Sequence, residues 1–220
     1  CVAISVQARP LFGEQKLFVD DWRFKLESGD KIKLNDDAEK WRKVTLPHDW
    51  SVEGRYSHTY GSATGYLPGG LGWYAKSFSV PESAKGKKVF IEFEGARQSA
   101  TVWLNGHHVG MSENGVMAFG FDLTPYINYR GDNRLEVLTD NDWNYHEQQH
   151  PDHSPYQWNN KNFNANYGGL PKHVRLHITD RLYQTLPLYS NLGTTGVYIY
   201  AKDIDVKGRS AEIVACSEVK

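Results

Sequence analysis

The chain has 220 residues, of which 40% are hydrophobic and 13% aromatic, and its formal net charge at pH 7 is −1. This length and composition allow one large domain, or one and a half, with an ample hydrophobic core. Lys and Arg are scattered along the sequence, so there is no basic field of the kind that holds nucleic acid. No apolar run reaches the roughly 20 residues that a membrane-spanning helix needs, so we expect no membrane span.

The first residues are small and apolar. Residues 1–8, which end in Val-Gln-Ala and precede Arg9 and Pro10, are typical of the end of a signal peptide with its cleavage site. A second interpretation makes Cys1 a lipid-bearing N-terminal cysteine. Both predict export, to the periplasm or cell surface of a bacterium. The alternative is a short edge strand in a cytosolic protein. The only other cysteine, Cys216, is too far along the chain for the two to indicate a disulfide framework or a metal site.

Short segments in which apolar and polar residues alternate dominate the sequence up to about residue 180, and Gly, Asn, Asp and Pro separate them. Asn105-Gly106 predicts a tight hairpin, because both central residues of such a turn adopt positive φ. Strands are predicted at 15–19, 22–25, 43–46, 72–80, 88–94, 99–104, 107–110, 118–122, 134–139 and 173–179. Many short strands with hairpins and longer connections indicate an all-β fold, an antiparallel sandwich of the jelly-roll kind.

The pattern changes near Asp180. Residues 182–196 contain no clear strand and indicate a linker that packs on the first domain. Residues 197–200 and 211–216 then predict two further strands, joined by a turn at 207–210. Two strands alone do not form a stable sheet, so we expect the sequence to stop inside a second β domain. We therefore divide the chain into a tail or signal-peptide remnant (1–10), a first sandwich (11–181), and a linker with a truncated domain (182–220).

Polar residues follow two of the predicted strands. His48 and Asp49 come after Pro47 and precede Trp50, so they are expected on a loop where Asp49 could accept hydrogen bonds from sugar hydroxyls and His48 could donate one. Asp140 and Asn141 follow the strand at 134–139 in the same way. For both pairs, turn formation by the Asx side chain is an equally good explanation.

A long segment, residues 143–166, is rich in Trp, Tyr, His and Asn, and a loop of this length is usually functional. His146, His150 and His153 have a spacing that could bind zinc on a helix, but Pro151 and Pro155 break any helix there, so we predict no metal site. We predict no cofactor. The Gly-Gly that follows Tyr167 indicates a tight turn into the last strand, with Tyr167 in the core.

Taken together, the motifs resemble a known family. They are, in chain order, Leu46-Pro47-His48-Asp49-Trp50, Gly72-Trp73-Tyr74, Val102-Trp103-Leu104-Asn105-Gly106, Phe121-Asp122-Leu123-Thr124, Gly131-Asp132-Asn133-Arg134-Leu135 and Tyr167-Gly168-Gly169-Leu170-Pro171. This ordered set is similar to the N-terminal sugar-binding domain of glycoside hydrolase family 2, the β-galactosidase and β-glucuronidase family, over about residues 15–180.

The resemblance implies a jelly-roll domain followed by an immunoglobulin-like sandwich, of which residues 197–220 would be the first strands, and then a TIM barrel with the two catalytic Glu residues. No catalytic residue is therefore expected in this chain. The resemblance also implies sugar contacts. The residue before the Trp of the first motif contacts galactose in β-galactosidases, where it is Asn and here is Asp49. A carboxylate after the strand at 134–139 has the same role, with Asp140, Asn141 or Asp142 as candidates. In β-glucuronidases an Asp of the long loop touches the sugar, and Asp152 is the only acidic residue late in this loop.

The leading hypothesis is an N-terminal fragment of an exported family 2 enzyme, β-galactosidase-like, with retaining hydrolysis of O-glycosidic bonds as the reaction of the whole protein. The expected partners are a β-galactoside or related glycan and the enzyme's own catalytic barrel, and the sequence leaves a homo-oligomer open. The alternatives are a free-standing carbohydrate-binding module, or the corresponding domain of a β-glucuronidase or β-mannosidase. A purely structural spacer sandwich is disfavoured by the length and polarity of residues 143–166.

Overall fold

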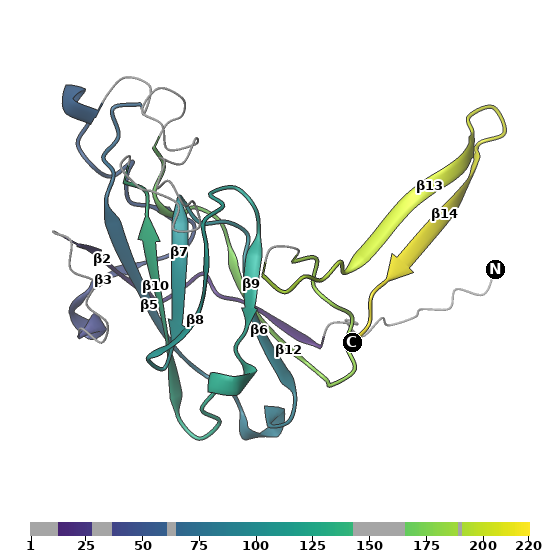
Figure 1. The fold of residues 1–220 in the computed structure, drawn as a ribbon, viewed down its shortest axis with the longest axis horizontal. Helices are drawn as coiled ribbons and strands as arrows, with labels where there is room; N and C mark the ends of the chain where they lie inside the picture. Colours follow the sequence, from purple (N-terminus) through teal and green to yellow (C-terminus); the bar gives the residue numbers. More distant parts are fainter. Residues whose placement is uncertain (1–12, 28–36, 61–64, 143–165, 189–190) are drawn as a thin grey trace, which may run out of the picture.

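The computed structural model describes residues 13–27, 37–60, 65–142, 166–188 and 191–220. In these ranges the chain forms strands and short 3₁₀ turns, and no helix is long and apolar enough to cross a membrane. Two antiparallel sheets pack face to face into a sandwich, and a two-stranded hairpin projects from it (Figure 1). The fold is all-β, an antiparallel sandwich as expected.

The larger sheet has six strands in the order β3-β2-β5-β10-β7-β8. Its strands are β3 (Arg42–Val44), β2 (Trp22–Glu27), β5 (Leu71–Ser79), β10 (Asp132–Asp140), β7 (Ser99–Leu104) and β8 (His107–Ser112). The Asn105-Gly106 turn joins β7 to β8, and both residues have positive φ, as predicted. The central pair, β5 and β10, runs in register over nine residues from Asp132↔Ser79 to Asp140↔Leu71, which fixes which side chains face the core.

The smaller sheet has the order β1-β12-β6-β9, with β1 (Glu14–Leu17), β12 (Val174–Thr179), β6 (Lys88–Phe93) and β9 (Phe119–Asp122). Two very short strands, β4 (His48–Asp49) and β11 (Gly169–Leu170), pair with each other outside both sheets. Four 3₁₀ turns complete the described elements: η1 (Ala38–Lys40), η2 (His58–Tyr60), η4 (Glu82–Ala84) and η5 (Thr124–Tyr126).

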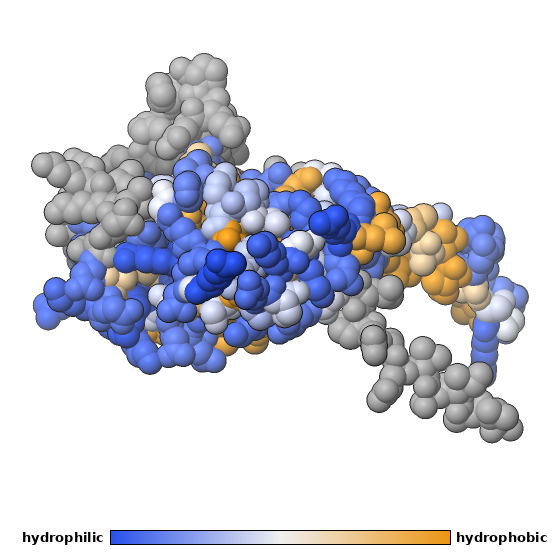
Figure 2. All heavy atoms as spheres, turned by 90° about the horizontal axis from the view of Figure 1, so that it is seen from below, coloured by the Kyte–Doolittle hydropathy of each residue, from blue (hydrophilic) through white to orange (hydrophobic). Residues whose placement is uncertain are grey.

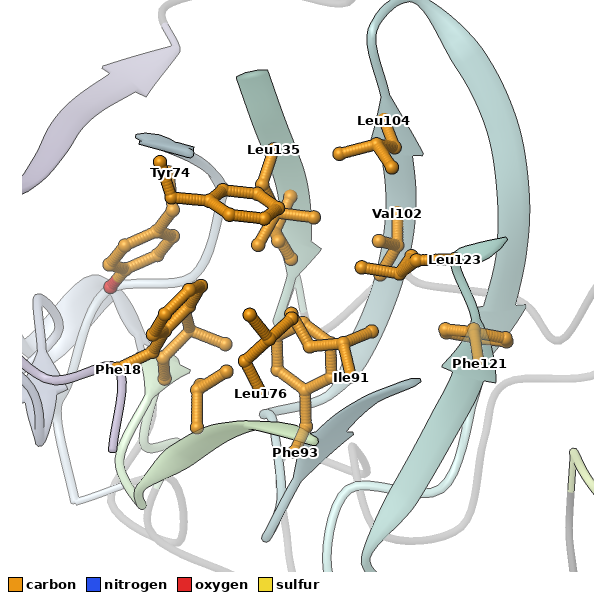
Figure 3. Close-up of a cluster of buried hydrophobic side chains, with 14 of the residues drawn as sticks. Phe18, Tyr74, Ile91, Phe93, Val102, Leu104, Phe121, Leu123, Leu135 and Leu176 are labelled. Atoms are coloured by element: carbon orange, nitrogen blue, oxygen red, sulfur yellow. The ribbon is translucent and has the colours of Figure 1, made fainter. Parts of the chain in front are cut away.

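The core lies between the two sheets, where alternate residues of each strand point inward (Figure 3). Tyr74, Val102 and Leu135 face inward from the larger sheet, and Ile91 and Leu176 face them from the smaller one, all 2% exposed or less. Aromatic side chains close the space between the layers. The larger sheet has a second apolar cluster on its outer face, formed by Ala38, Leu71, Trp73, Ala75, Trp103, Leu138 and Trp41.

The segment after β12 packs on the outer face of the smaller sheet. Leu186 and Leu188 are buried against Phe90 of β6, and the ring of Tyr183 lies 5.2 Å from the Phe90 ring. Residues 183–185 then bond to the end of the chain: the Tyr183 and Lys220 backbones exchange two hydrogen bonds of 2.9 and 3.0 Å. The expected linker is therefore held on the sandwich.

The hairpin of β13 (Val197–Asp205) and β14 (Ser210–Ser217) begins where this linker ends. Hydrophobic side chains cover it (Figure 2) and are largely exposed: Tyr198 is 63% exposed, Ile199 63% and Ile213 64%. Because strand neighbours alternate between faces, Tyr198 and Ile199 lie on opposite faces of the hairpin. Both faces are thus apolar, which is typical of strands that are covered on two sides.

The strand predictions are confirmed, with ends that agree or differ by up to five residues. Two short strands, β4 and β11, were not predicted. The prediction for Tyr167 is wrong, because its side chain is 50% exposed and Leu170, which is fully buried, takes the core position of this segment. Asp152 and the three His residues of the long loop lie outside the described residues.

Candidate functional site

Five segments that are far apart in sequence meet at one end of the sandwich, the upper end in Figure 1. β10 ends there at Asp140, which pairs with Leu71 at the start of β5 and Ser99 at the start of β7. The β4–β11 pair lies beside them, and Gly169 of β11 also pairs with Arg97. The structure therefore brings four of the predicted site residues, His48, Asp49, Asp140 and Asn141, to the same end of the molecule.

Asp49 closes a turn and also ties β4 to β11. Its Oδ1 atom accepts hydrogen bonds from the backbone N–H of Ser51 at 3.0 Å and of Gly168 at 2.9 Å. Burial raises the pKa of Asp49 above its ordinary value, while these two backbone hydrogen bonds lower it. The turn function that the sequence allowed is thus present. The sugar contact stays a prediction.

His48 points into the protein, with its side chain 8% exposed. Its Nδ1 lies 2.7 Å from the hydroxyl oxygen of Tyr74, and its Nε2 lies 3.2 Å from Oε1 of Glu53. Burial lowers the pKa of His48, and burial raises the pKa of the Tyr74 phenol, so a neutral imidazole faces a protonated hydroxyl. Arg42 Nη2 lies 3.1 Å from the same Nε2, the Tyr74 hydroxyl also donates to the His48 carbonyl at 3.3 Å, and the pKa of Glu53 is lowered by its hydrogen bond with Arg42. Both ring nitrogens have protein partners, which indicates a positioning role for His48.

Asn141 is the most densely bonded side chain of the site and is fully buried. Its Oδ1 accepts from the Gly70 N–H at 3.1 Å. Its Nδ2 donates to Ser51 Oγ at 2.8 Å and to the carbonyl oxygens of Tyr167 at 3.1 Å and Asn166 at 3.3 Å. One amide thus ties the segments before β5, after β4 and before β11 to the end of β10. Both polar atoms of this amide are therefore hydrogen-bonded within the protein.

Asp140 differs from its neighbour because its carboxylate has few partners. Its Oδ1 accepts one hydrogen bond, from the Asp142 N–H at 2.9 Å, and its own carbonyl accepts from the Gln98 N–H at 2.8 Å. Burial raises the pKa of Asp140 to about 6, and the nearby Asp142 carboxylate adds to the shift. Carboxyl groups whose pKa is strongly raised cluster at functional sites. Asp140, at the end of β10, is therefore a candidate functional residue.

Two glycines complete the site, and the sequence indicated only a turn for them. A Cβ on Gly168 would lie 2.5 Å from Asn141 Nδ2 and from Ser51 Oγ, and a Cβ on Gly169 would lie 2.1 Å from the Tyr74 hydroxyl. The backbone of β11 therefore approaches these side chains as only glycine allows. No group of three or more His, Cys, Asp or Glu side chains that could hold a metal occurs in the part of the chain that the structure describes.

Comparison with known proteins identifies the domain. Residues 72–179, which run from the second residue of β5 to the end of β12, match the family model described as the glycosyl hydrolase 2 galactose-binding domain-like. The chain carries the galactose-binding-like domain of glycoside hydrolase family 2. The matched region of this family 2 domain includes Asp140, Asn141 and the Gly168-Gly169 pair, whereas His48 and Asp49 precede it.

Relatives with glycosidase names extend the similarity. A β-glucuronidase from Formosa agariphila is 38% identical over 207 residues, which is 91% of this chain and 20% of that protein. A β-galactosidase from Bacteroides ovatus is 42% identical over 131 residues, 58% of this chain and 15% of that protein. The solved structure of a family 2 β-glucuronidase has a TM-score of 0.78 at 34% identity and covers 94% of this chain and 22% of its own. The chain thus spans about a fifth of the length of the relatives it matches.

The raised pKa of Asp140 in this family 2 domain gives a testable pH dependence. The native state holds a proton on Asp140 up to about pH 6, whereas the unfolded chain releases it near 3.8. Because the native state binds more protons in this window, the free energy of unfolding falls as the pH rises from about 4 to 6, by about 2 to 3 kcal/mol. Asp140→Asn removes this loss, since its amide oxygen can still accept from Asp142. We expect the variant to match the wild type near pH 4 and to be about 2 kcal/mol more stable at pH 8.

Urea unfolding of both proteins across this pH range measures the difference. The matched control is Asp122→Asn, because Asp122 is paired with Lys88 at 2.8 Å and caps the Thr124 N–H at 2.9 Å. That substitution removes a favourable ion pair and is expected to destabilise the protein at pH 8. A stability difference between Asp140→Asn and the wild type that does not change with pH would contradict the raised pKa.

Proposed function

We propose that this chain is the part of a family 2 β-glycosidase, β-galactosidase-like, that borders the sugar site of the whole enzyme. The carrying observation is the pair of partly buried carboxylates, Asp49 and Asp140, at one end of the sandwich. Both have raised pKa values, and Asn141 and the β4–β11 pair fix the backbone around them. Retaining hydrolysis of the glycosidic bond would then take place on two carboxyl groups of a barrel domain outside this sequence.

The charge of the site supports a neutral galactoside over a glucuronide. A uronate carboxylate placed beside Asp49 and Asp140 would meet like charges, whereas the hydroxyl groups of a neutral sugar can donate to both. The Formosa agariphila relative favours the β-glucuronidase alternative, because it is named a β-glucuronidase and its match covers 91% of this chain. The two candidates predict opposite substrate preferences for the same protein.

The test uses the full-length protein with Asp49→Asn and Asp140→Asn, assayed on an aryl β-galactoside and an aryl β-glucuronide. Loss of a charge-assisted hydrogen bond to a sugar hydroxyl is worth about 1.5 to 3 kcal/mol, so kcat/KM on the preferred substrate is expected to fall about 10- to 100-fold. Asp122→Asn, at the end of β9 in the smaller sheet, is the control. Unchanged kinetics for both site variants would contradict the proposal. A preference for the glucuronide would be consistent with a family 2 β-glycosidase but would contradict the assignment of a galactoside as its substrate.

A stand-alone carbohydrate-binding module is the second candidate function. Isothermal titration of this 220-residue chain with galactosides distinguishes it, because a module binds its sugar without a barrel domain. Micromolar binding by the chain alone that Asp49→Asn abolishes would favour the module, whereas a site completed by a barrel predicts no binding that depends on Asp49.

The domain organisation and the location in the cell belong to the same proposal. We assign residues 11–181 to the sugar-binding domain and 182–220 to a linker and the first strands of an immunoglobulin-like sandwich. The exposed apolar side chains on both faces of β13 and β14 support the second assignment. We also propose export to the periplasm or cell surface, on the basis of the apolar residues 1–8. If Cys1 is the mature N-terminus of a lipoprotein, its side chain would carry the lipid. Fractionation of the producing cells, with metabolic palmitate labelling, tests both.

A further inference from the structure

A hollow lies on the outer face of the larger sheet, at a distance from the candidate site. Its volume is about 290 Å³, and it is lined by Asp21, Arg23, Asp37, Ala38, Glu39, Lys43, Ala75, Lys76, Ser77 and Arg134. Ser77 is six residues along β5 from Leu71, the partner of Asp140, which corresponds to on the order of 20 Å. The hollow and the Asp49–Asp140 site are therefore separate features of the molecule.

Small side chains form the floor of the hollow. Ala75 and Ser77 are alternate residues of β5 and share its outer face, next to Trp73, which is 1% exposed. In register across the sheet, Ala75 has Arg23 on one side and Glu136 on the other, and Ser77 has Arg134 beside it. Long side chains on both flanks of two short ones leave the depression, in which Ala75 is buried at the base and Ser77 is exposed.

Ion pairs form the walls and fix the side chains that line the hollow. Arg23 Nη2 lies 3.2 Å from Glu39 Oε2, and its Nη1 donates to the Trp41 carbonyl at 3.4 Å. On the opposite wall, Arg134 Nη2 lies 2.8 Å from Oε1 of Glu136, whose side chain is 1% exposed. Such paired guanidinium groups are pre-organised, which lowers the entropy cost of binding a ligand.

Three of the four cations that line the hollow, Arg23, Lys43 and Arg134, are paired with carboxylates. Lys43 is paired with Asp21 at 2.7 Å, and Lys76 donates to the Asp20 carbonyl at 2.6 Å beside the Phe18 ring. An anion would have to displace a carboxylate from its cation, which costs most of the attraction it gains. A neutral polyhydroxyl ring has no such cost, because a hydroxyl group can accept from the Arg23 guanidinium while it donates to the Glu39 carboxylate.

We propose that this hollow is a second carbohydrate-binding site for a neutral sugar unit, distinct from the Asp49–Asp140 end. Arg23 with Glu39 supplies donors and an acceptor from one side, and the Arg134 guanidinium and the exposed Ser77 hydroxyl face the ring from the other. On this assignment the domain binds a glycan at the outer face of its larger sheet, independently of the function of the Asp49–Asp140 site.

The test is a backbone amide NMR titration of the 220-residue chain with methyl β-galactoside, methyl β-glucoside and glucuronate. We expect saturable shift changes at Arg23, Ala75, Ser77 and Arg134 with at least one neutral glycoside, and none there with glucuronate. Changes at these amides with glucuronate alone would overturn the neutral assignment. An absence of changes there with all three probes would overturn the site.

Ser77→Trp provides the matched variant, because Ser77 is exposed and its enlargement fills the hollow without entering the core. Ser79→Trp is the control, since Ser79 is also exposed, lies on the same face of β5 and does not line the hollow. Ser77→Trp is expected to weaken binding at least about tenfold while Ser79→Trp leaves it unchanged. Asp140→Asn is expected to have no effect on this binding, so the outcome is independent of the proposed function.

Discussion

Replacing Gly169 with alanine is expected to lower the free energy of unfolding by about 3 to 5 kcal/mol. Gly169 has a φ of +96°, and a Cβ there would lie 2.1 Å from the Tyr74 hydroxyl and 3.0 Å from the His48 carbonyl oxygen. The Tyr74 side chain is fully buried and cannot swing away. The variant therefore combines an unfavourable backbone conformation with a clash at the β4–β11 pair. Urea unfolding at pH 7 measures the loss.

Two controls separate the two causes. Gly106→Ala has a similar φ, +81°, but no atom within 4 Å of the added Cβ, so it is expected to cost only about 1 kcal/mol. In a Tyr74→Phe background the hydroxyl is gone, and Gly169→Ala is expected to cost less than in the wild type. An equal cost in both backgrounds would show that the close approach to Tyr74 has no energetic consequence.

Replacing Asn141 with alanine is expected to cost about 3 to 5 kcal/mol, although the change removes only one side-chain amide. The Gly70 N–H, the Ser51 hydroxyl and the carbonyl groups of Asn166 and Tyr167 all bond to it inside the protein. Each buried group left without a partner costs about 1 to 3 kcal/mol. Unfolding in urea measures the loss, and slower proteolysis of the wild type than of the variant gives an independent readout.

Asn141→Asp tests the direction of these bonds. An ionised Asp keeps the acceptor for Gly70 but turns an oxygen toward Ser51 Oγ and two carbonyl oxygens, so at pH 7 it is expected to be at least as unstable as the alanine variant. Its deficit should shrink as the pH falls, because the protonated acid can donate one hydrogen bond. Asn114→Ala is the control. It removes two bonds to the Val116 and Met117 N–H groups in a partly exposed loop, at an expected cost of about 1 kcal/mol. A cost for Asn141→Ala no larger than this would contradict its assigned role.

The sandwich is predictable from the sequence because its strands carry their own signals. Alternation places Leu135 and Val137 on one face of β10, and the Asn105-Gly106 turn sets the register of β7 with β8. The short strands β4 and β11 carry no such signal, since two residues have no period. They form because Asp49 bonds to the Gly168 N–H, a contact between residues more than a hundred positions apart.

The candidate site is predictable in part, for the same reason. The end of β10 shows where Asp140 and Asn141 lie, because both follow an alternating strand. Their different roles depend on partners from other segments: the Asn141 amide bonds to residues 25 to 90 positions away, whereas the Asp140 carboxylate accepts from the Asp142 N–H, two positions away. His48 similarly turns inward because Tyr74 offers a buried hydroxyl, a partner that no local pattern identifies.

The order of strands in the smaller sheet determines when the domain can form during synthesis on the ribosome. β12 lies between β1 and β6, and its residue Ile178 pairs with Glu14, near the other end of the domain. Until β12 has left the ribosome, β1 lacks its partner and β6 has one edge open, although both strands were made long before. At about 5 to 20 residues per second the early strands wait for several seconds with apolar faces uncovered. Any shorter version that ends before Val174 would remain in this incomplete state.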